Sequence, residues 1–207
     1  MRKIIILFLL TTAFLYSCVD KNSKKDKDLE IQAISKNKTT DEISVINSDN
    51  DIDASLREKL PKSLFDQNII SNGKINNNFE VDLRIRPFYL KEDFNGDKIA
   101  DIALPIKDSK SGKVGFAIIH GKTKDIYIIG AGKMIKNAIS DDMGYIDIWN
   151  IDREKEVVGT EEDENGDLID TPTIFLKSPS IKIEKSELGG GLIFWNGDEY
   201  QYLHQTC

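Results

Sequence analysis

Apolar and polar residues alternate in short runs along most of the chain after about residue 79. Residues 79–85 follow the period-2 pattern of a strand with one buried face. Further strand candidates lie at 99–105, 114–119, 125–129, 145–151, 173–176 and 181–183. Asn196-Gly197 joins 192–195 to 198–203 as a hairpin, because this pair tolerates the positive φ angles of a type I′ turn. The pattern predicts a mainly β fold, in which an antiparallel sheet forms a sandwich or partial barrel.

A short helix is expected before the strands. Asp53 can cap its first turn, Leu56 and Leu60 are spaced i, i+4, and Pro61 cannot continue it. The sequence therefore predicts one or two short helices at the edge of the sheet.

The first residues have the pattern of an export signal. Arg2 and Lys3 precede an apolar run at 4–16, which is shorter than the roughly 20 residues that cross a bilayer. Leu15-Tyr16-Ser17-Cys18 follows and resembles the lipobox of bacterial lipoproteins, with a small residue directly before the Cys. The resemblance implies that residues 1–17 are a lipoprotein signal peptide and that Cys18 becomes an N-terminus acylated with chains such as palmitate. The alternative is an ordinary cleaved signal beside an unrelated Cys.

Composition separates a tether from a domain. All 14 Gly lie from Gly73 onward, and all five Pro lie from Pro61 onward. Residues 19–52 contain no Gly, Pro, Phe, Tyr or Trp, and they bury too little apolar area to offset the entropy lost on folding. We therefore predict an acylated Cys and flexible tether at 18–52 and a mainly β domain at 53–207.

Charge and cysteine content exclude some classes of protein. The 207-residue chain has 28 Lys and Arg against 35 Asp and Glu, a net charge of −7. Nucleic-acid binders favour the opposite sign, so we expect no nucleic-acid partner. Cys18 and Cys207 are too few for a disulfide framework. No serine-hydrolase elbow, zinc-protease motif, P-loop or dinucleotide fingerprint occurs.

One segment carries the chemistry of a cation site. Asp93, Asn95, Asp97 and Asp101 occupy positions 1, 3, 5 and 9 of a short loop with Gly at position 4. Calcium prefers six to eight oxygen ligands, and alternate side chains of a tight loop can supply several of them. The spacing differs from that of an EF-hand, which needs Gly at position 6 and Glu at position 12.

The loop resembles the calcium loop of FG-GAP and VCBS-type repeats over about 15 residues. The resemblance implies that Asp93, Asn95, Asp97 and Asp101 hold Ca²⁺, although Lys98 stands where that family usually has Gly. The chain has no second full repeat, so a multi-blade propeller is not expected. The competing interpretation is a plain Asn-Gly turn with solvated aspartates.

A second acidic segment partly repeats the first. Asp163, Asn165, Asp167 and Asp170 form a weaker second candidate metal site, because the last carboxylate comes at position 8. Otherwise this segment is an acidic turn in solvent.

Together these features predict a lipid-anchored protein of the bacterial cell envelope. We expect the outer membrane, with the periplasmic or surface face left open. The predicted function is a non-catalytic, Ca²⁺-stabilised β binding module with an unknown protein or glycan partner. The alternatives are an inhibitor or immunity-type lipoprotein that acts on a cell-wall enzyme, and a hydrolase. A cleft lined by Asp141, Asp142 and His120 would favour the hydrolase, whereas a flat acidic face would favour a basic partner.

Overall fold

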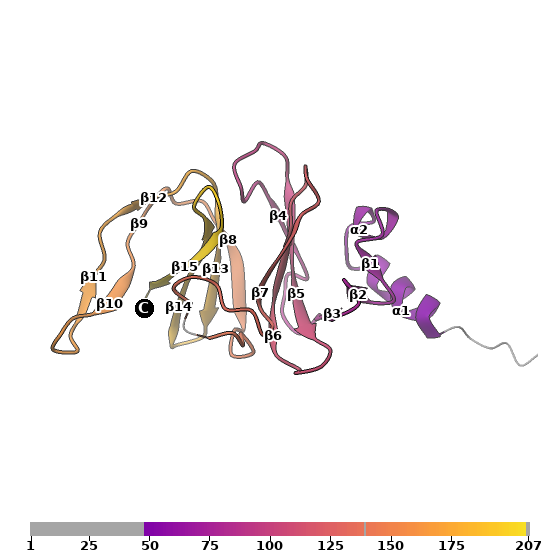
Figure 1. The fold of residues 1–207 in the computed structure, drawn as a ribbon, viewed down its shortest axis with the longest axis horizontal. Helices are drawn as coiled ribbons and strands as arrows, with labels where there is room; N and C mark the ends of the chain where they lie inside the picture. Colours follow the sequence, from indigo (N-terminus) through magenta and orange to yellow (C-terminus); the bar gives the residue numbers. More distant parts are fainter. Residues whose placement is uncertain (1–47, 139, 206–207) are drawn as a thin grey trace, which may run out of the picture. The chain divides into compact units, whose positions relative to one another are not determined.

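The computed structural model describes residues 48–138 and 140–205, all within one compact unit, Ser44–Cys207. Antiparallel strands dominate the described residues, which include two short helices (Figure 1). The predicted mainly β class is therefore confirmed. The predicted signal peptide, Cys18 and the tether up to residue 47 lie outside the described residues.

The first sheet has seven strands. They are β1 (Ile70–Ser71), β2 (Lys74–Ile75), β3 (Phe79–Val81), β4 (Leu90–Glu92), β5 (Asp101–Asp108), β6 (Val114–Ile119) and β7 (Ile126–Gly130). One edge of β5 pairs with β4 along its first residues and with β3 along its last. Pro105 lies between these two stretches, and its carbonyl oxygen accepts the Asp82 N–H at 2.9 Å. The missing N–H of Pro105 therefore falls where the partner strand changes, and no ladder bond is lost there.

The second sheet has four strands in the order β15-β14-β13-β8. They are β8 (Ile148–Asp152), β13 (Ser180–Lys185), β14 (Gly189–Trp195) and β15 (Tyr200–Gln205). Two small ribbons come between β8 and β13 in the chain. β9 (Glu156–Val157) pairs with β12 (Ile174–Phe175), and β10 (Thr160–Glu162) pairs with β11 (Leu168–Asp170).

The predicted C-terminal hairpin is present, but its turn is centred one residue later than expected. Trp195 pairs with Tyr200, and the Asn196 N–H donates to the Glu199 carbonyl oxygen at 3.1 Å. Gly197, with φ of 116°, therefore takes the first central position of the turn. The Asn196 side chain accepts the Asp198 and Glu199 N–H groups, so it acts as an Asx cap instead of a central turn residue.

The main core lies between the two sheets. Trp149 of β8 stacks on Phe116 of β6 with ring centroids 5.0 Å apart, and its Nε1 donates to the Pro87 carbonyl oxygen at 2.8 Å. Both sheets supply its buried residues, among them Leu90, Phe94, Ala103, Phe116, Ile118, Ile129, Trp149, Ile181, Ile183, Ile193, Tyr200 and Tyr202. The inward faces of the strands thus meet as in a sandwich.

The helices cover the other face of the first sheet. α1 (Ser48–Arg57) and α2 (Ser63–Asp66) contribute to a cluster of buried residues that includes Leu56, Leu64, Phe65, Leu104, Ile106 and Ile119. α1 begins at Ser48, so Asp53 lies inside the helix and does not cap its start as predicted. Its carboxylate instead accepts the N–H groups of Asn72 at 3.2 Å and Gly73 at 2.8 Å. No helix in the described part of the chain combines the length and apolar character that a membrane crossing needs.

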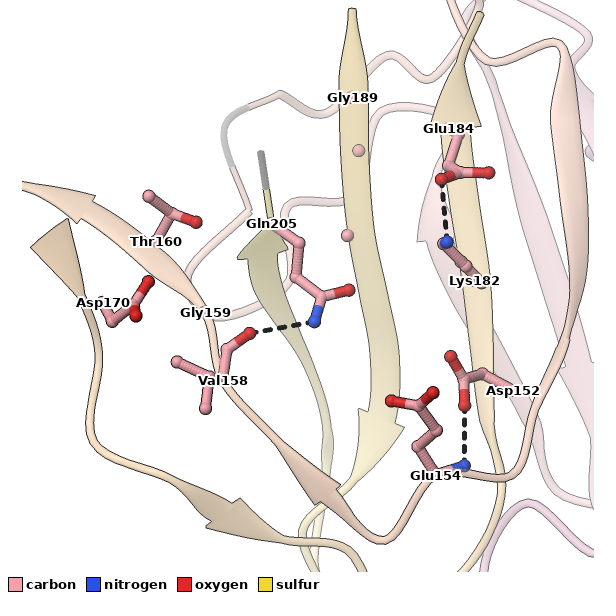
Figure 2. Close-up of a pocket in the computed structure, with 12 residues that line it drawn as sticks. Asp152, Glu154, Val158, Gly159, Thr160, Asp170, Lys182, Glu184, Gly189 and Gln205 are labelled. Atoms are coloured by element: carbon pink, nitrogen blue, oxygen red, sulfur yellow. Dashed lines mark hydrogen bonds and ion pairs between the residues drawn. The ribbon is translucent and has the colours of Figure 1, made fainter. Parts of the chain in front are cut away.

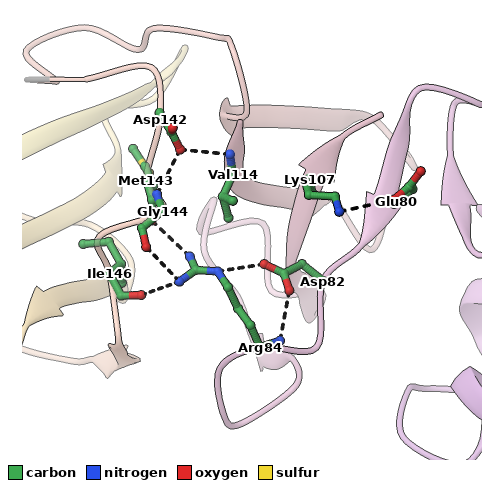
Figure 3. A network of polar contacts seen from close by, with 9 residues as sticks. All are labelled: Glu80, Asp82, Arg84, Lys107, Val114, Asp142, Met143, Gly144 and Ile146. Carbon is green, nitrogen blue, oxygen red and sulfur yellow. Dashed lines mark hydrogen bonds and ion pairs between the residues drawn. The ribbon is translucent and has the colours of Figure 1, made fainter. Parts of the chain in front are cut away.

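Arg84 fastens the connection that leads from the first sheet to the second (Figure 3). Its guanidinium donates to three carbonyl oxygens of this connection, on Met143 (3.0 Å), Gly144 (3.2 Å) and Ile146 (2.7 Å). Its Nε also pairs with the Asp82 carboxylate at 2.7 Å. A single side chain therefore holds the segment before β8 against the segment after β3.

Candidate functional site

The loop between β4 and β5 is closed by the Asp93 carboxylate. Asp93 accepts three backbone N–H groups of its own loop, from Gly96 (2.7 Å), Asp97 (3.0 Å) and Lys98 (2.9 Å). Lys98 has a φ of 71°, the left-handed conformation that favours glycine. The resembled calcium loop usually has Gly at this position, and the resemblance itself stays a prediction.

Asp101 is the buried member of the predicted set. Its side chain is fully buried, and its two oxygens accept the N–H groups of Phe94 at 3.0 Å and Gly121 at 2.7 Å. Burial raises the pKa of this carboxyl, while the two backbone N–H bonds and nearby His120 act in the opposite direction. Asp101 therefore ties the predicted loop to the turn between β6 and β7.

The other two predicted ligands bond within the loop. Asn95 Oδ1 accepts the Asp97 N–H at 3.0 Å, and Asp97 Oδ1 accepts the Ile99 N–H at 2.8 Å. Among the described residues, no group of three or more His, Cys, Asp or Glu is arranged to hold a metal ion. The oxygens of this loop serve backbone amides in the structure, so calcium binding stays a prediction that titration must test.

The second predicted set is divided between the two ends of the β10–β11 ribbon. Asp163 accepts the N–H groups of Asn165 (2.8 Å) and Asp167 (2.9 Å) in the turn, and these bonds lower its pKa. Asp170 pairs with Thr160 at the opposite end of the ribbon. The structure thus brings together the first three residues of this set and separates the fourth from them.

Of the residues that would mark a hydrolase cleft, His120 follows the last residue of β6, whereas Asp141 and Asp142 contact Lys113 and Val114 at its start. His120 is buried, and its Nε2 lies 2.9 Å from the Tyr200 hydroxyl within a cluster of aromatic rings. Asp141 pairs with Lys113 at 2.6 Å. Asp142 accepts the N–H groups of Val114 and Gly144, both at 3.0 Å. Each of these side chains therefore already has a partner within the fold.

A polar groove of about 400 Å³ lies on the face of the second sheet that points away from the main core (Figure 2). Part of this face is covered, because its apolar residues Leu192, Phe194 and Leu203 pack with Val157 and Leu176. The remainder carries polar side chains and glycine, and it stays open. The residues that line this part are Asp152, Glu154, Val158, Gly159, Thr160, Asp170, Lys182, Glu184, Gly189, Gly190, Gly191 and Gln205.

Strand register explains the composition of the groove. Glu184, Gly190 and Gln205 are cross-strand partners, so they share one face of β13, β14 and β15. A Cβ on Gly190 would lie 1.9 Å from the Ile183 carbonyl oxygen, so this position accepts only glycine. The Gln205 amide donates to the Val158 carbonyl oxygen at 2.9 Å, which holds the 158–160 wall beside the sheet. Gly190 therefore leaves an open position on this face between the side chains of Glu184 and Gln205.

The groove has an excess of negative charge. Lys182 pairs with Glu184 at 2.9 Å, while Asp152, Glu154 and Asp170 form no ion pair within the described residues. Sequence periodicity did not reveal this site, because the groove draws on strands far apart in the chain. A usable signal was present, however, in the concentration of acidic residues between 152 and 170.

Comparison with known proteins finds no matching family model, no matching curated protein and no matching solved structure. The functional argument therefore depends on this chain's own residues.

Proposed function

We propose that this protein is a lipid-anchored lipoprotein of the bacterial cell envelope and that its β domain is a non-catalytic binding module. The observation that carries the anchor is the order of residues at the N-terminus: Arg2 and Lys3, an apolar run at 4–16, then Leu15-Tyr16-Ser17-Cys18. We place the protein in the outer membrane, with either face possible for the domain.

The physical chemistry of lipid anchoring supports this arrangement. One acyl chain holds a protein only marginally at a membrane, whereas several chains on one residue hold it stably, at about 0.8 kcal/mol per buried CH₂ group. Removal of residues 1–17 takes away Arg2 and Lys3, so the net charge of the mature chain is −7 − 2 = −9. A chain with this charge gains no electrostatic attraction to anionic lipids, so the anchor has to supply the membrane affinity.

The open groove beside Gly190 supports a binding role for the domain. It is concave and polar, and three of its carboxylates have no ion-pair partner among the described residues. The position of His120 at the opposite end of β6 from Asp141 and Asp142 favours binding over hydrolysis, because general acid–base chemistry needs its groups within hydrogen-bond reach of one substrate. Binding of Ca²⁺ at Asp93, Asn95, Asp97 and Asp101 is a separable part of the proposal.

A second candidate function is inhibition of a cell-wall enzyme, as by an immunity-type lipoprotein. The observation that favours it is the β10–β11 ribbon, in which every residue of β11 is exposed. A projecting ribbon with exposed apolar side chains is a suitable shape for insertion into a partner's cleft.

Expression of the full chain in a bacterial host, with fractionation and palmitate labelling, tests the anchor. The wild type should collect in the membrane fraction and carry label, and Cys18→Ser should do neither. Cys207→Ser is the matched control and should behave as wild type. Soluble, unlabelled wild-type protein would contradict the anchor, and equal labelling of Cys18→Ser would show that Cys18 is not the acylated residue.

A further inference from the structure

We propose that the groove and the β10–β11 ribbon form one binding surface for an extended, positively charged protein segment. This inference deepens the binding function proposed above and rests on it. We call the surface the acidic face. Its main residues are Asp152, Glu154, Glu162, Leu168, Asp170 and Glu184.

Charge is concentrated on this part of the chain. Residues 152–170 contain nine Asp and Glu against Arg153 and Lys155, a net charge of 2 − 9 = −7. This equals the net charge of all 207 residues, so the rest of the chain is balanced. Arg153 is moreover occupied elsewhere, because it pairs with Glu92 at 2.5 Å. Carboxylates close together repel one another, so a cationic partner at this face relieves a repulsion that the fold leaves in place.

The groove supplies an open channel for such a partner. Gly190 leaves an open position in it, and Asp152, Glu154 and Asp170 have no ion pair within the described residues. Lys182 cannot neutralise them all, since it already binds Glu184 at 2.9 Å. The hydrogen bond with Glu184 raises the pKa of Lys182, and the charges of Asp152 and Glu154 add to this effect.

An unsatisfied hydroxyl lies on the same face of the sheet. Ser180 is fully buried, and its Oγ has no hydrogen-bond partner among residues 48–138 and 140–205. It alternates with Lys182 and Glu184 along β13, so it shares their side of the sheet, and it is the cross-strand partner of Asp152. A buried polar group without a partner costs free energy, but Ser180 does not line the groove, so the binding proposal does not depend on it.

The ribbon adds apolar contacts next to the carboxylates. Leu168 is 60% exposed and Ile169 is 43% exposed, although neighbouring residues of a strand point to opposite faces. Leu168 pairs with Glu162, and Ile169 pairs with Glu161. Leu168 and Glu162 therefore lie on the face of the ribbon that also carries the groove residue Asp170, and Ile169 and Glu161 lie on the opposite face. Small cations do not need apolar contacts, whereas a peptide that alternates basic and apolar residues matches both.

The direct test is peptide binding by the full-length protein, purified in detergent and followed by fluorescence anisotropy. The probe is a labelled decapeptide that alternates Lys and Val, and the reference probe alternates Glu and Val. We expect the Lys peptide to bind saturably at about 150 mM salt and the Glu peptide not to bind. Failure of the Lys peptide to bind at concentrations up to about 1 mM would overturn the proposal.

Two matched double variants locate the binding. Glu154→Gln with Asp170→Asn removes two groove charges that form no ion pair among the described residues, and it should weaken the Lys peptide about tenfold. Glu58→Gln with Asp198→Asn makes the same change in net charge on exposed residues elsewhere and should change affinity less than about twofold. Equal weakening of peptide binding by both variants would show that only the net charge of the protein matters, and it would refute the proposed binding site.

A third variant tests the ribbon. Leu168→Ser changes only an exposed side chain, so it should fold normally while binding the Lys peptide more weakly, and Ile169→Ser on the opposite face of the ribbon is its matched control. Unchanged affinity would remove the ribbon from the surface. These readouts are independent of the anchor: a protein that is labelled with palmitate but binds no peptide refutes this inference alone.

Discussion

Replacement of Arg84 by alanine should destabilise the domain by about 2–3 kcal/mol. The magnitude follows from its contacts. Arg84 donates to part-buried carbonyl oxygens on Met143 and Ile146, each bond contributing about 1 kcal/mol, and to a more exposed one on Gly144. Its pair with Asp82, partly exposed, adds about 0.5 kcal/mol. The Met143 oxygen keeps a second donor, the Ile146 N–H at 3.2 Å, so most of the loss arises at the Ile146 oxygen.

Arg84→Lys is the informative companion to Arg84→Ala. An ammonium is a compact group and cannot reach three carbonyl oxygens and a carboxylate in the planar geometry of a guanidinium. We expect it to recover part of the loss, leaving a deficit of about 1–2 kcal/mol.

Urea unfolding followed by tryptophan fluorescence measures both variants, because Trp149 lies in the core between the sheets. For a domain of this size, 1 kcal/mol corresponds to about 2–4 °C, so thermal melts of Arg84→Ala should show a Tm lowered by about 5–10 °C. A change in the free energy of unfolding below about 0.5 kcal/mol in Arg84→Ala, or wild-type stability in Arg84→Lys, would refute the conclusion that Arg84 holds the segment between β7 and β8 in place.

Three further predictions use other parts of the molecule. Gly190→Ala places a methyl group 1.9 Å from a carbonyl oxygen of β13, so it should lower the free energy of unfolding in urea by more than about 2 kcal/mol. Gly132→Ala is the control: no atom lies within 4 Å of the added methyl group, so only backbone strain of about 1–2 kcal/mol is expected. Hydrogen bonds from Lys185 and Ser186 lower the pKa of Asp147 to about 2, below the 3.8 of an unperturbed Asp. The contribution of Asp147 to stability is therefore present above about pH 3.8 and is lost as the pH falls through 2. NMR titration measures this pKa, and an ordinary value near 3.8 would contradict the prediction. Calcium at ten times its Kd should stabilise the wild type by about 1.4 kcal/mol and Asp93→Ala not at all, and calorimetry that detects no heat at millimolar Ca²⁺ would exclude the calcium loop.

The sequence by itself determined the local features of this protein. Period-2 alternation predicted most strands of both sheets, and Asn196-Gly197 predicted the last hairpin, although the turn is centred one residue later. The closed loop that begins at Asp93 was also predictable as a turn of oxygen-bearing residues, because its bonds join residues at most five apart. Interactions over so short a distance in the chain depend on only a few neighbouring residues.

The tertiary structure decided which segments meet. β8 pairs with β13, although the two ribbons lie between them in the chain. The register of this pair places Asp152, Lys182 and Glu184 on one face of the sheet. The pairing of β10 with β11 puts Asp170 at the groove and not beside Asp163, as the second acidic motif had suggested. Strand periodicity states which residues share a face, but it does not state which strands are neighbours. Neighbours are selected by burying the apolar faces of both sheets together around Trp149, and that selection depends on the whole chain.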